Sequence, residues 1–425
     1  MPNTTKRWTR LLPMLLLGCG LSTGASGQLT LGECRQLARE NYPLVRKYDL
    51  IRQSEQYNLK NAAKGYLPQL SLSGKATLQT DVTKIPVSLP GIDVPTLSKD
   101  QYQALLEVSQ TIWDGGAIRA QKQDAGASAD IDRQQFEVDM YTLNGRVNDL
   151  FFGILLLDEQ LAQNGLYRKE LQRNYDNVAG YMDNGIANQA DLDAVAVELL
   201  AAGQQRIELE SLREAYAEML GMLTGTELDG QALVRPSVPQ ETAPLEINRP
   251  ELGLFDARDR WLDVQRRAVS AKNRPKISAF VQGAYGNPGL NMLKEGFMPY
   301  AIGGIRLSWN FGNLYTSRNS LRLIETSRRD VATQRDVFLF NTRLEATRQS
   351  AEAQKYRDVM RDDDRIVELR ENIRRAAEAK VAYGTLSVTE LIREIHAEES
   401  ARQSRLLHGI ELLKSIYELK NTTNN

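Results

Sequence analysis

Side chains able to do enzymatic or metal chemistry are scarce in this chain of 425 residues. It has two histidines, His396 and His408, and two cysteines, Cys19 and Cys34. This set is too small for a His/Cys metal site or a disulfide framework. No nucleophile elbow, phosphate-binding loop, zinc-protease motif or dinucleotide fingerprint occurs in a supporting context. We therefore predict no enzymatic activity, metal or cofactor, and we interpret both histidines as structural.

The densest acidic group is the run Asp362, Asp363 and Asp364, which Arg361 and Arg365 flank. A cation site is one interpretation of this run. On a long exposed helix, a solvated face is favoured instead. The overall charge is balanced, with 53 Lys and Arg against 54 Asp and Glu. A nucleic-acid partner is not expected because it would normally require a basic excess.

The first 27 residues have the pattern of a secretory signal peptide: Lys6, Arg7 and Arg10, then a short apolar core, then small residues up to Gly27. A second interpretation is lipidation at Cys19, because residues 16–19 read Leu-Leu-Gly-Cys. Either alternative implies export. If cleavage follows Gly27, the mature chain keeps only Cys34, which we expect to be a small core residue. No run of about 18 apolar residues is available for a transmembrane helix.

An internal repeat organises the remainder of the chain. Four landmarks recur in the same order, at offsets between 197 and 207: Asn41-Tyr-Pro with Asn248-Arg-Pro, Leu67-Pro-Gln-Leu with Arg274-Pro-Lys-Ile, Trp113-Asp-Gly with Asn310-Phe-Gly, and Gly185 to Leu192 with Gly384 to Leu391. The pattern predicts a first unit over 28–224, a connector over 225–247 and a second unit over 248–425. The first unit carries a longer insertion within 75–101.

Each unit is expected to open with a helix and a β-hairpin. Thr30 and Glu33 form a capping box that starts a helix running to about Lys64. The counterpart starts near Asn248, with Pro250 in its first turn. Period-2 alternation then predicts hairpins at about 69–113 and 276–311. Such strands suit either a half-buried soluble sheet or a membrane barrel, apolar toward lipid and polar inward.

Two very long helical hairpins follow, over about 117–224 and 313–420. No proline occurs between Arg119 and Pro236, or from Asn313 to the end of the chain. A helix from about 117 to 183 would be on the order of 100 Å long. Apolar residues in the first unit step by four and three, and the second unit shows a weaker seam. These seams are Phe136, Met140, Leu143, Val147, Leu150, Ile154, Leu157 and Leu161, then Val337, Phe340, Leu344, Thr347 and Ala351.

Each long helix is expected to end in a tight tip. Gly185 and Gly384 are suited to the left-handed position that ends a helix. Asp191 and Glu390 then fall in the first turn of the returning helices, where the helix dipole favours a carboxylate. A role as simple helix-start residues remains open for both acids.

Four strands per chain cannot close a barrel, and open strand edges are not tolerated in lipid. The strands therefore form a small soluble sheet, or several chains pool them. Three chains would give twelve strands and two would give eight, both allowed barrel sizes. Export and long paired helices favour pooling. The other functional class is a secreted or periplasmic structural coiled coil without channel activity.

Nearly the whole mature chain resembles the TolC family of bacterial outer membrane efflux and secretion channels. The resemblance rests on Leu29 to Glu33, Gly65 to Ser71, Trp113 to Gly116, and the two tips. It implies a mainly α chain with membrane β-strands, assembled as a homotrimer with a 12-stranded barrel and an α-helical coiled-coil barrel in the periplasm. The implied partners are outer membrane lipid, a periplasmic adaptor (membrane fusion protein), and an inner-membrane pump of the RND, ABC or MFS type. The channel would be a passive exit duct for efflux or type I secretion.

The resemblance also implies roles for residues at the tips. Those implied to dock the adaptor are Gly185, Ile186, Leu192, Gly384, Leu386, Ser387 and Leu391. Asp191 and Glu390 match acidic positions that face the entrance in this family. The chain departs from the pattern at Arg393, where some members carry a further acid. An entrance ring of mixed sign would alter ion preference and the closing contacts. The second strand-to-helix turn also departs, with Phe311-Gly312-Asn313 in place of Asp-Gly-Gly.

Overall fold

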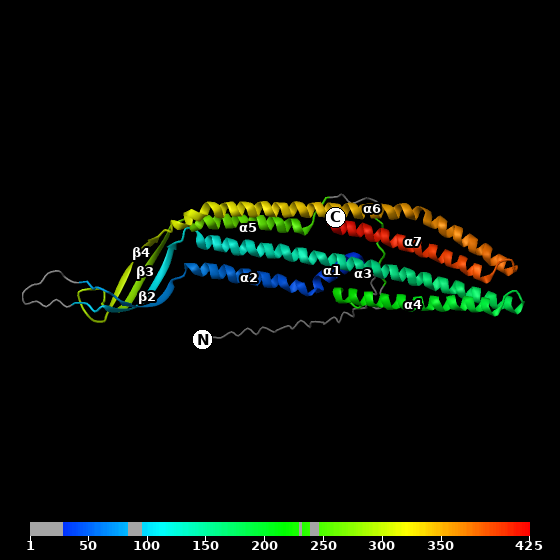
Figure 1. The fold of residues 1–425 in the computed structure, drawn as a ribbon, viewed down its shortest axis with the longest axis horizontal. Coiled ribbons are helices and arrows are strands. Elements are labelled where there is room, and N and C mark those ends of the chain that lie inside the picture. Colours follow the sequence, from blue (N-terminus) through cyan, green and yellow to red (C-terminus); the bar gives the residue numbers. More distant parts are fainter. Residues whose placement is uncertain (1–28, 84–95, 229–231, 239–245) are drawn as a thin grey trace, which may run out of the picture.

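A computed structural model describes residues 29–83, 96–228, 232–238 and 246–425. The predicted leader with Cys19, the loop from Ile85 to Pro95 and part of the connector lie outside the described residues. The chain is elongated, with a β-sheet at one end and two helical tips at the other (Figure 1). Two helices run along the helical part between them: α3 (Ala117–Asp183, 67 residues) and α6 (Gly312–Ala382, 71 residues).

The first predicted helix is in fact two helices. The structure has α1 (Leu31–Asn41), a 3₁₀ turn at Pro43–Val45, and α2 (Arg46–Ala63). Tyr42 is extended, with φ −62° and ψ 130°, because the ring of Pro43 disfavours a helical residue before it. The Thr30–Glu33 capping box is present as predicted. The second unit has a single helix in this place, α5 (Pro250–Lys272).

The strands form one antiparallel sheet in the order β1-β2-β3-β4. Their bounds are β1 Gln69–Leu78, β2 Asp100–Trp113, β3 Lys276–Asn287 and β4 Met298–Ser308. The two predicted hairpins join through β2 and β3, with Leu106 opposite Gly283. Within the described residues, β1 and β4 each have one strand neighbour, so both outer edges of the sheet are open.

The two faces of the sheet differ in character. Residues in register on one face are apolar and largely exposed: Leu70, Leu72, Leu78, Tyr102, Leu106, Val108, Val281, Tyr285, Ile305 and Leu307. The other face carries polar pairs. Glu107 of β2 accepts hydrogen bonds from Arg306 of β4 at 3.0 Å and from Gln282 of β3 at 2.5 Å. This division matches the predicted alternation along the strands.

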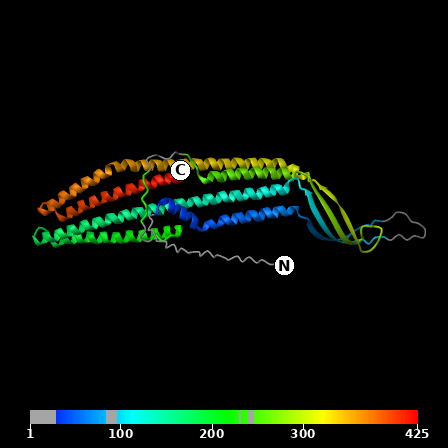
Figure 2. The same ribbon diagram turned by 180° about the vertical axis from the view of Figure 1, so that it is seen from behind.

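The helices form two successive sets of four, which the view from behind separates well (Figure 2). Nearest the sheet, packing joins α2 to α3, α3 to α5, and α5 to α6. Toward the tips, α4 (Gln189–Thr224) packs on α3, α3 on α7 (Val388–Thr423), and α7 on α6. One flank of the protomer is therefore α6, and the other is α2 followed by α4.

The predicted seam in the first unit is confirmed. Seven of its members, from Phe136 to Leu157, are buried, and Leu161 is half-buried. Around them, α1, α3, α4 and α7 share a core that includes Cys34, which is fully buried as expected. The pKa of the Cys34 thiol is raised to about 11 because burial disfavours the thiolate.

The seam predicted in the second unit is wrong for the single chain. Val337, Phe340 and Leu344 are 54%, 62% and 56% exposed. Toward α7, α6 instead turns smaller residues inward, so that Ala353 packs against Leu412 and Ile416. The heptad spacing identified an apolar stripe but could not indicate which neighbour covers it. No described helix combines the length and apolar character needed to cross a membrane.

Candidate functional site

The first tip is a tight turn set by one glycine. α3 ends at Asp183, and Gly185 has φ +71°, the left-handed conformation that disfavours residues with a Cβ atom. The backbone N–H of Ile186 donates to the carbonyl of Tyr181 at 2.8 Å, which closes the end of the helix. Asn188 then starts α4 and forms a capping box with Asp191.

The second tip repeats this construction. Gly384 has φ +67°, and the N–H of Thr385 donates to the Lys380 carbonyl at 2.9 Å. Ser387 starts α7 and forms a capping box with Glu390. The pKa of Glu390 is lowered, first by the backbone N–H of Ser387 and then by its hydroxyl. Both αL glycines and both returning helices were predicted from the sequence.

The residues predicted to dock a partner divide into buried and exposed groups. Leu192 and Leu391 are 9% and 3% exposed, so they hold the hairpins together beneath the turns and offer no surface to a partner. Ile186 is exposed. Its Cγ2 methyl group lies 3.9 Å from the position that a Cβ atom on Gly384 would occupy. The two tips therefore lie side by side. Tyr383, which sequence reasoning missed, is 84% exposed beside Gly384.

The residues predicted to gate the entrance lie at the starts of the returning helices. The carboxylates of Asp191 and Glu390 both accept hydrogen bonds from the backbone of their own N-cap residues. This geometry accounts for both acids as helix-start residues, and a gating role remains a prediction. The Arg393 side chain is 74% exposed, and Glu394 lies 3.6 Å from it. The positive charge of Arg393 also contributes to lowering the pKa of Glu390.

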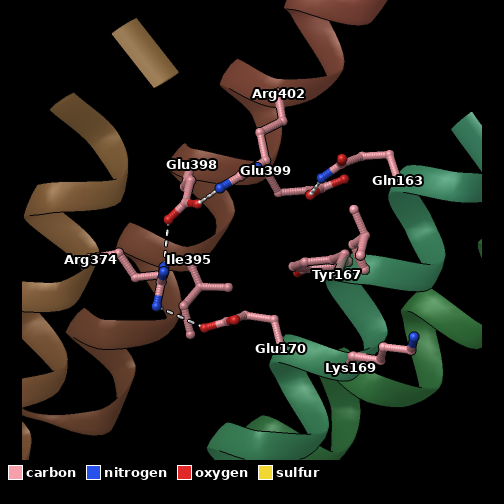
Figure 3. Close-up of a pocket in the computed structure, with 10 residues that line it drawn as sticks. Gln163, Tyr167, Lys169, Glu170, Arg374, Ile395, Glu398, Glu399 and Arg402 are labelled. Atoms are coloured by element: carbon pink, nitrogen blue, oxygen red, sulfur yellow. Dashed lines mark hydrogen bonds and ion pairs between the residues drawn. The ribbon is translucent and has the colours of Figure 1, made fainter. Parts of the chain in front are cut away.

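A buried charged cluster connects the two helical hairpins about 15 Å from the second tip, at 1.5 Å per residue from Gly384. We call it the charged joint: Arg374 and Glu378 of α6, Glu170 of α3, and Glu398 and Arg402 of α7. The Arg374 side chain, 8% exposed, donates to Glu398 at 2.5 Å, to Glu170 at 2.8 Å and to Glu378 at 2.7 Å. Figure 3 shows the Arg374 guanidinium between the carboxylates of Glu398 and Glu170.

The charged joint borders a cavity of about 310 Å³ between α3 and α7. On its far side, Gln163 donates to Glu399 at 2.7 Å (Figure 3). Burial raises the pKa of Glu399, and burial likewise raises that of Glu170 despite its arginine neighbours. Nearby, Tyr167 contacts His396, whose other ring nitrogen lies 3.0 Å from Glu198. These groups tie α3 to α4, α6 and α7, so the joint fixes how the two hairpins sit against each other.

The acidic run on α6 is only partly a solvated face. Asp362 is exposed, as the sequence indicated, and Asp364 pairs with Arg405. Asp363, however, is 6% exposed and lies 2.9 Å from His408 of α7. Successive residues on a helix point in different directions, and of these three it is Asp363 that faces the packed side. Among the described residues, no group of three or more His, Cys, Asp or Glu side chains is arranged to hold a metal ion.

Comparison with known proteins identifies the family. Residues 34–226 match the model of the outer membrane efflux protein family. Residues 34–226 belong to that family. It is a family of channels rather than enzymes, located in the bacterial outer membrane with a helical tunnel in the periplasm. No curated protein matches the chain.

Solved structures of outer membrane channels share the fold of this chain. The chain is similar to the outer-membrane channel OprN, with 14% identity and a TM-score of 0.67 over 92% of this chain and 89% of that one. VceC of Vibrio cholerae gives 12% identity and 0.65, covering 92% and 94%. The open state of MtrE from Neisseria gonorrhoeae gives 13% and 0.63, covering 93% and 89%. The fold and family support the channel interpretation over a secreted structural coiled coil.

Proposed function

We propose that three copies of this outer membrane efflux protein form a passive exit duct. The duct receives substrate from an inner-membrane pump of the RND, ABC or MFS type through a periplasmic adaptor. The observation that carries the proposal is the sheet, whose apolar face is exposed while both of its edges are open. A bilayer accepts strands only when every edge is paired. Three copies supply twelve strands, which closes the sheet with the apolar face toward lipid and the Glu107–Arg306 pair inside.

The helical flanks support the same assembly. Contacts between helices show which residues lie at the same position along the long axis of the chain. Asn164 of α3 donates to the carbonyl of Ala202 of α4, and Glu170 of α3 pairs with Arg374 of α6. Counted from these contacts, Val197 of α4 and Ile373 of α6 lie at the same position along the long axis. They are on opposite flanks of one chain, and their side chains are 61% and 46% exposed. A ring of copies brings α6 of one against α4 of the next and covers both.

The tips are the proposed docking surface for the adaptor. Ile186 and Tyr383 provide exposed apolar contacts there, while Gly185 and Gly384 set the turn geometry. Leu386 and Ser387 lie in the second turn, where Ser387 caps α7. Asp191, Glu390 and Arg393 place charge of both signs beside this surface, where they can influence ion entry.

A crosslinking experiment tests the assembly. With Val197→Cys and Ile373→Cys in one chain, oxidation joins α4 of one copy to α6 of the next and gives covalent trimers in the outer membrane fraction. The matched control, Val197→Cys with Phe340→Cys, places the two thiols at different heights and stays monomeric on a denaturing gel. Recovery of the protein in the soluble periplasm, or crosslinking that stops at dimers, contradicts the proposal.

A further inference from the structure

A ring of positive charge surrounds the place where the helices meet the sheet. We call it the basic collar, and it occupies all four helix ends at this level. Its members are Lys60 and Lys64 around the end of α2, Arg119 and Lys122 in α3, Arg266, Arg267, Lys272 and Arg274 around the end of α5, and Arg318 and Arg322 in α6. The segments 56–80, 115–123, 264–294 and 296–324 contain no Asp or Glu. Positive charge is thus segregated here in a chain that is balanced overall.

Helix stability does not account for the basic collar. Cations suit the carboxyl ends of α2 and α5, where the helix dipole is negative. The same dipole disfavours cations at the amino ends of α3 and α6, and neither helix has an acid in its first turn. Arg119, Lys122 and Arg318 nevertheless lie within the first two turns of these helices. These cations therefore gain nothing from the helix dipole, and at the start of α3 the buried carboxylate of Asp114 instead accepts hydrogen bonds from the backbone N–H groups of Gly116 and Ile118.

Three arginines of the basic collar line one cavity. It lies between the start of α3 and the end of α5, has a volume of about 340 Å³, and is lined by Arg119, Arg267 and Arg274. No described carboxylate lies within ion-pair distance of these arginines, and the guanidinium of Arg274 donates a hydrogen bond to the Gly115 carbonyl at 3.3 Å. Guanidinium groups bind phosphate oxygens through paired N–H donors. Ser270 adds a hydroxyl to the same cavity.

Aromatic residues place the basic collar relative to the membrane. Trp309 and Phe311 pack with ring centroids 4.6 Å apart, just beyond the apolar strip of β4. Trp113 lies at the corresponding end of β2, and all three are 42–56% exposed. Tryptophan and aromatic belts mark the boundary between hydrocarbon and headgroups. The basic collar begins within one or two helical turns of this belt, which is the level of the lipid phosphates.

We propose that the basic collar binds anionic lipid headgroups of the periplasmic leaflet, and that the cavity of Arg119, Arg267 and Arg274 holds one lipid phosphate. The inference rests on the membrane placement of the sheet in the proposed function. An anionic headgroup neutralises arginines that have no carboxylate partner, and in return the arginines fix the depth of the barrel in the bilayer. The lipid would have a phosphate monoanion without a compensating amine, as in phosphatidylglycerol.

Tryptophan quenching by brominated lipid tests the proposal, because Trp113 and Trp309 border the basic collar. The full-length protein is reconstituted in phosphatidylcholine with a rising fraction of brominated phosphatidylglycerol or brominated phosphatidylcholine. We expect stronger quenching by the anionic lipid, with a preference of about fivefold per engaged arginine. High salt should reduce this preference through screening. Quenching by brominated phosphatidylcholine alone reports membrane insertion, so failure of the proposed function is seen separately.

Two triple variants assign the preference to residues. Arg119→Gln/Arg267→Gln/Arg274→Gln should lose most of the preference while remaining inserted and trimeric. The control variant Arg343→Gln/Arg361→Gln/Arg365→Gln removes the same amount of charge from α6 at positions away from the sheet. It should retain the preference for the anionic lipid. Equal quenching of the unaltered protein by both lipids overturns the proposal, as does a preference that survives the first variant. A preference abolished by inorganic phosphate, but not by sulfate at equal ionic strength, identifies free phosphate as the ligand and also overturns it.

Discussion

Replacing Arg374 by glutamine should loosen the contact between the two helical hairpins. The substitution leaves Glu398, only 7% exposed, without its guanidinium partner, and it also removes a partner from Glu170 and Glu378. Breaking a buried ion pair by removing one member costs about 3–5 kcal/mol. We take the lower end, about 3 kcal/mol, because Glu170 and Glu378 are about a quarter exposed and water can partly solvate them.

Hydrogen exchange measured by mass spectrometry on the full-length protein is the suitable assay, since it resolves local opening segment by segment. A loss of about 3 kcal/mol corresponds to roughly 100-fold faster exchange in peptides covering α6 and α7 near the charged joint. Exchange in the sheet and in the helices nearest the sheet should be unaffected. The variant Arg374→Gln/Glu398→Gln should recover part of the protection, because it no longer leaves that carboxylate unpaired.

The control is Arg348→Gln, on the same helix. Arg348 also contacts two carboxylates, Glu345 and Glu352, but its side chain is 59% exposed and water screens the pairs. We expect little change in exchange. If Arg374→Gln exchanges no faster than Arg348→Gln near residues 374 and 398, the joint does not hold the hairpins together and the reasoning fails.

Three further outcomes follow from the structure. Gly384→Val forces a β-branched residue to φ +67°, at a cost of about 1–2 kcal/mol, and should impair efflux complementation while trimers persist; normal resistance at equal expression would contradict docking at this tip. Glu399 has a folded-state pKa raised by burial, so stability should increase as the pH falls from 7 toward the unfolded value near 4.5, and Glu399→Gln should reduce this pH dependence of thermal unfolding; an unchanged slope would contradict it. The Cys34 thiol is buried with a pKa of about 11, so maleimide at pH 7.5 should label Cys34 only after unfolding, and rapid labelling of the native protein would refute its placement.

Local signals in the sequence predicted much of the fold. The capping box at Thr30, the absence of proline after Arg119, and the tip glycines each act through nearby backbone geometry, so one sequence suffices to identify them. Pro43 was visible too, but the helical pattern on both sides concealed the break that it makes between α1 and α2. The repeat predicted two units, whereas the joining of β2 to β3 depends on contacts distant in the sequence.

Features that depend on which surfaces meet were not predictable. The stripe of Val337, Phe340 and Leu344 has the spacing of a core seam, yet it faces outward because α6 packs through its small residues. Arg374 and Glu398 look like ordinary exposed helix charges in the sequence. The pairing of α6 with α7 brings them together, and the packing of α3 against this hairpin adds Glu170 to the buried site. Leu192 and Leu391 were assigned to the docking surface by resemblance, and burial moves them beneath it.

The central claim is that one chain supplies a third of a conducting pore. The most direct measurement is ion current through the purified, detergent-extracted protein inserted into a planar lipid bilayer. We predict discrete, uniform conductance steps for the unaltered protein, with ion selectivity that shifts when Arg393 is replaced by glutamine. Inserted trimers that give no current steps at any voltage would contradict the account.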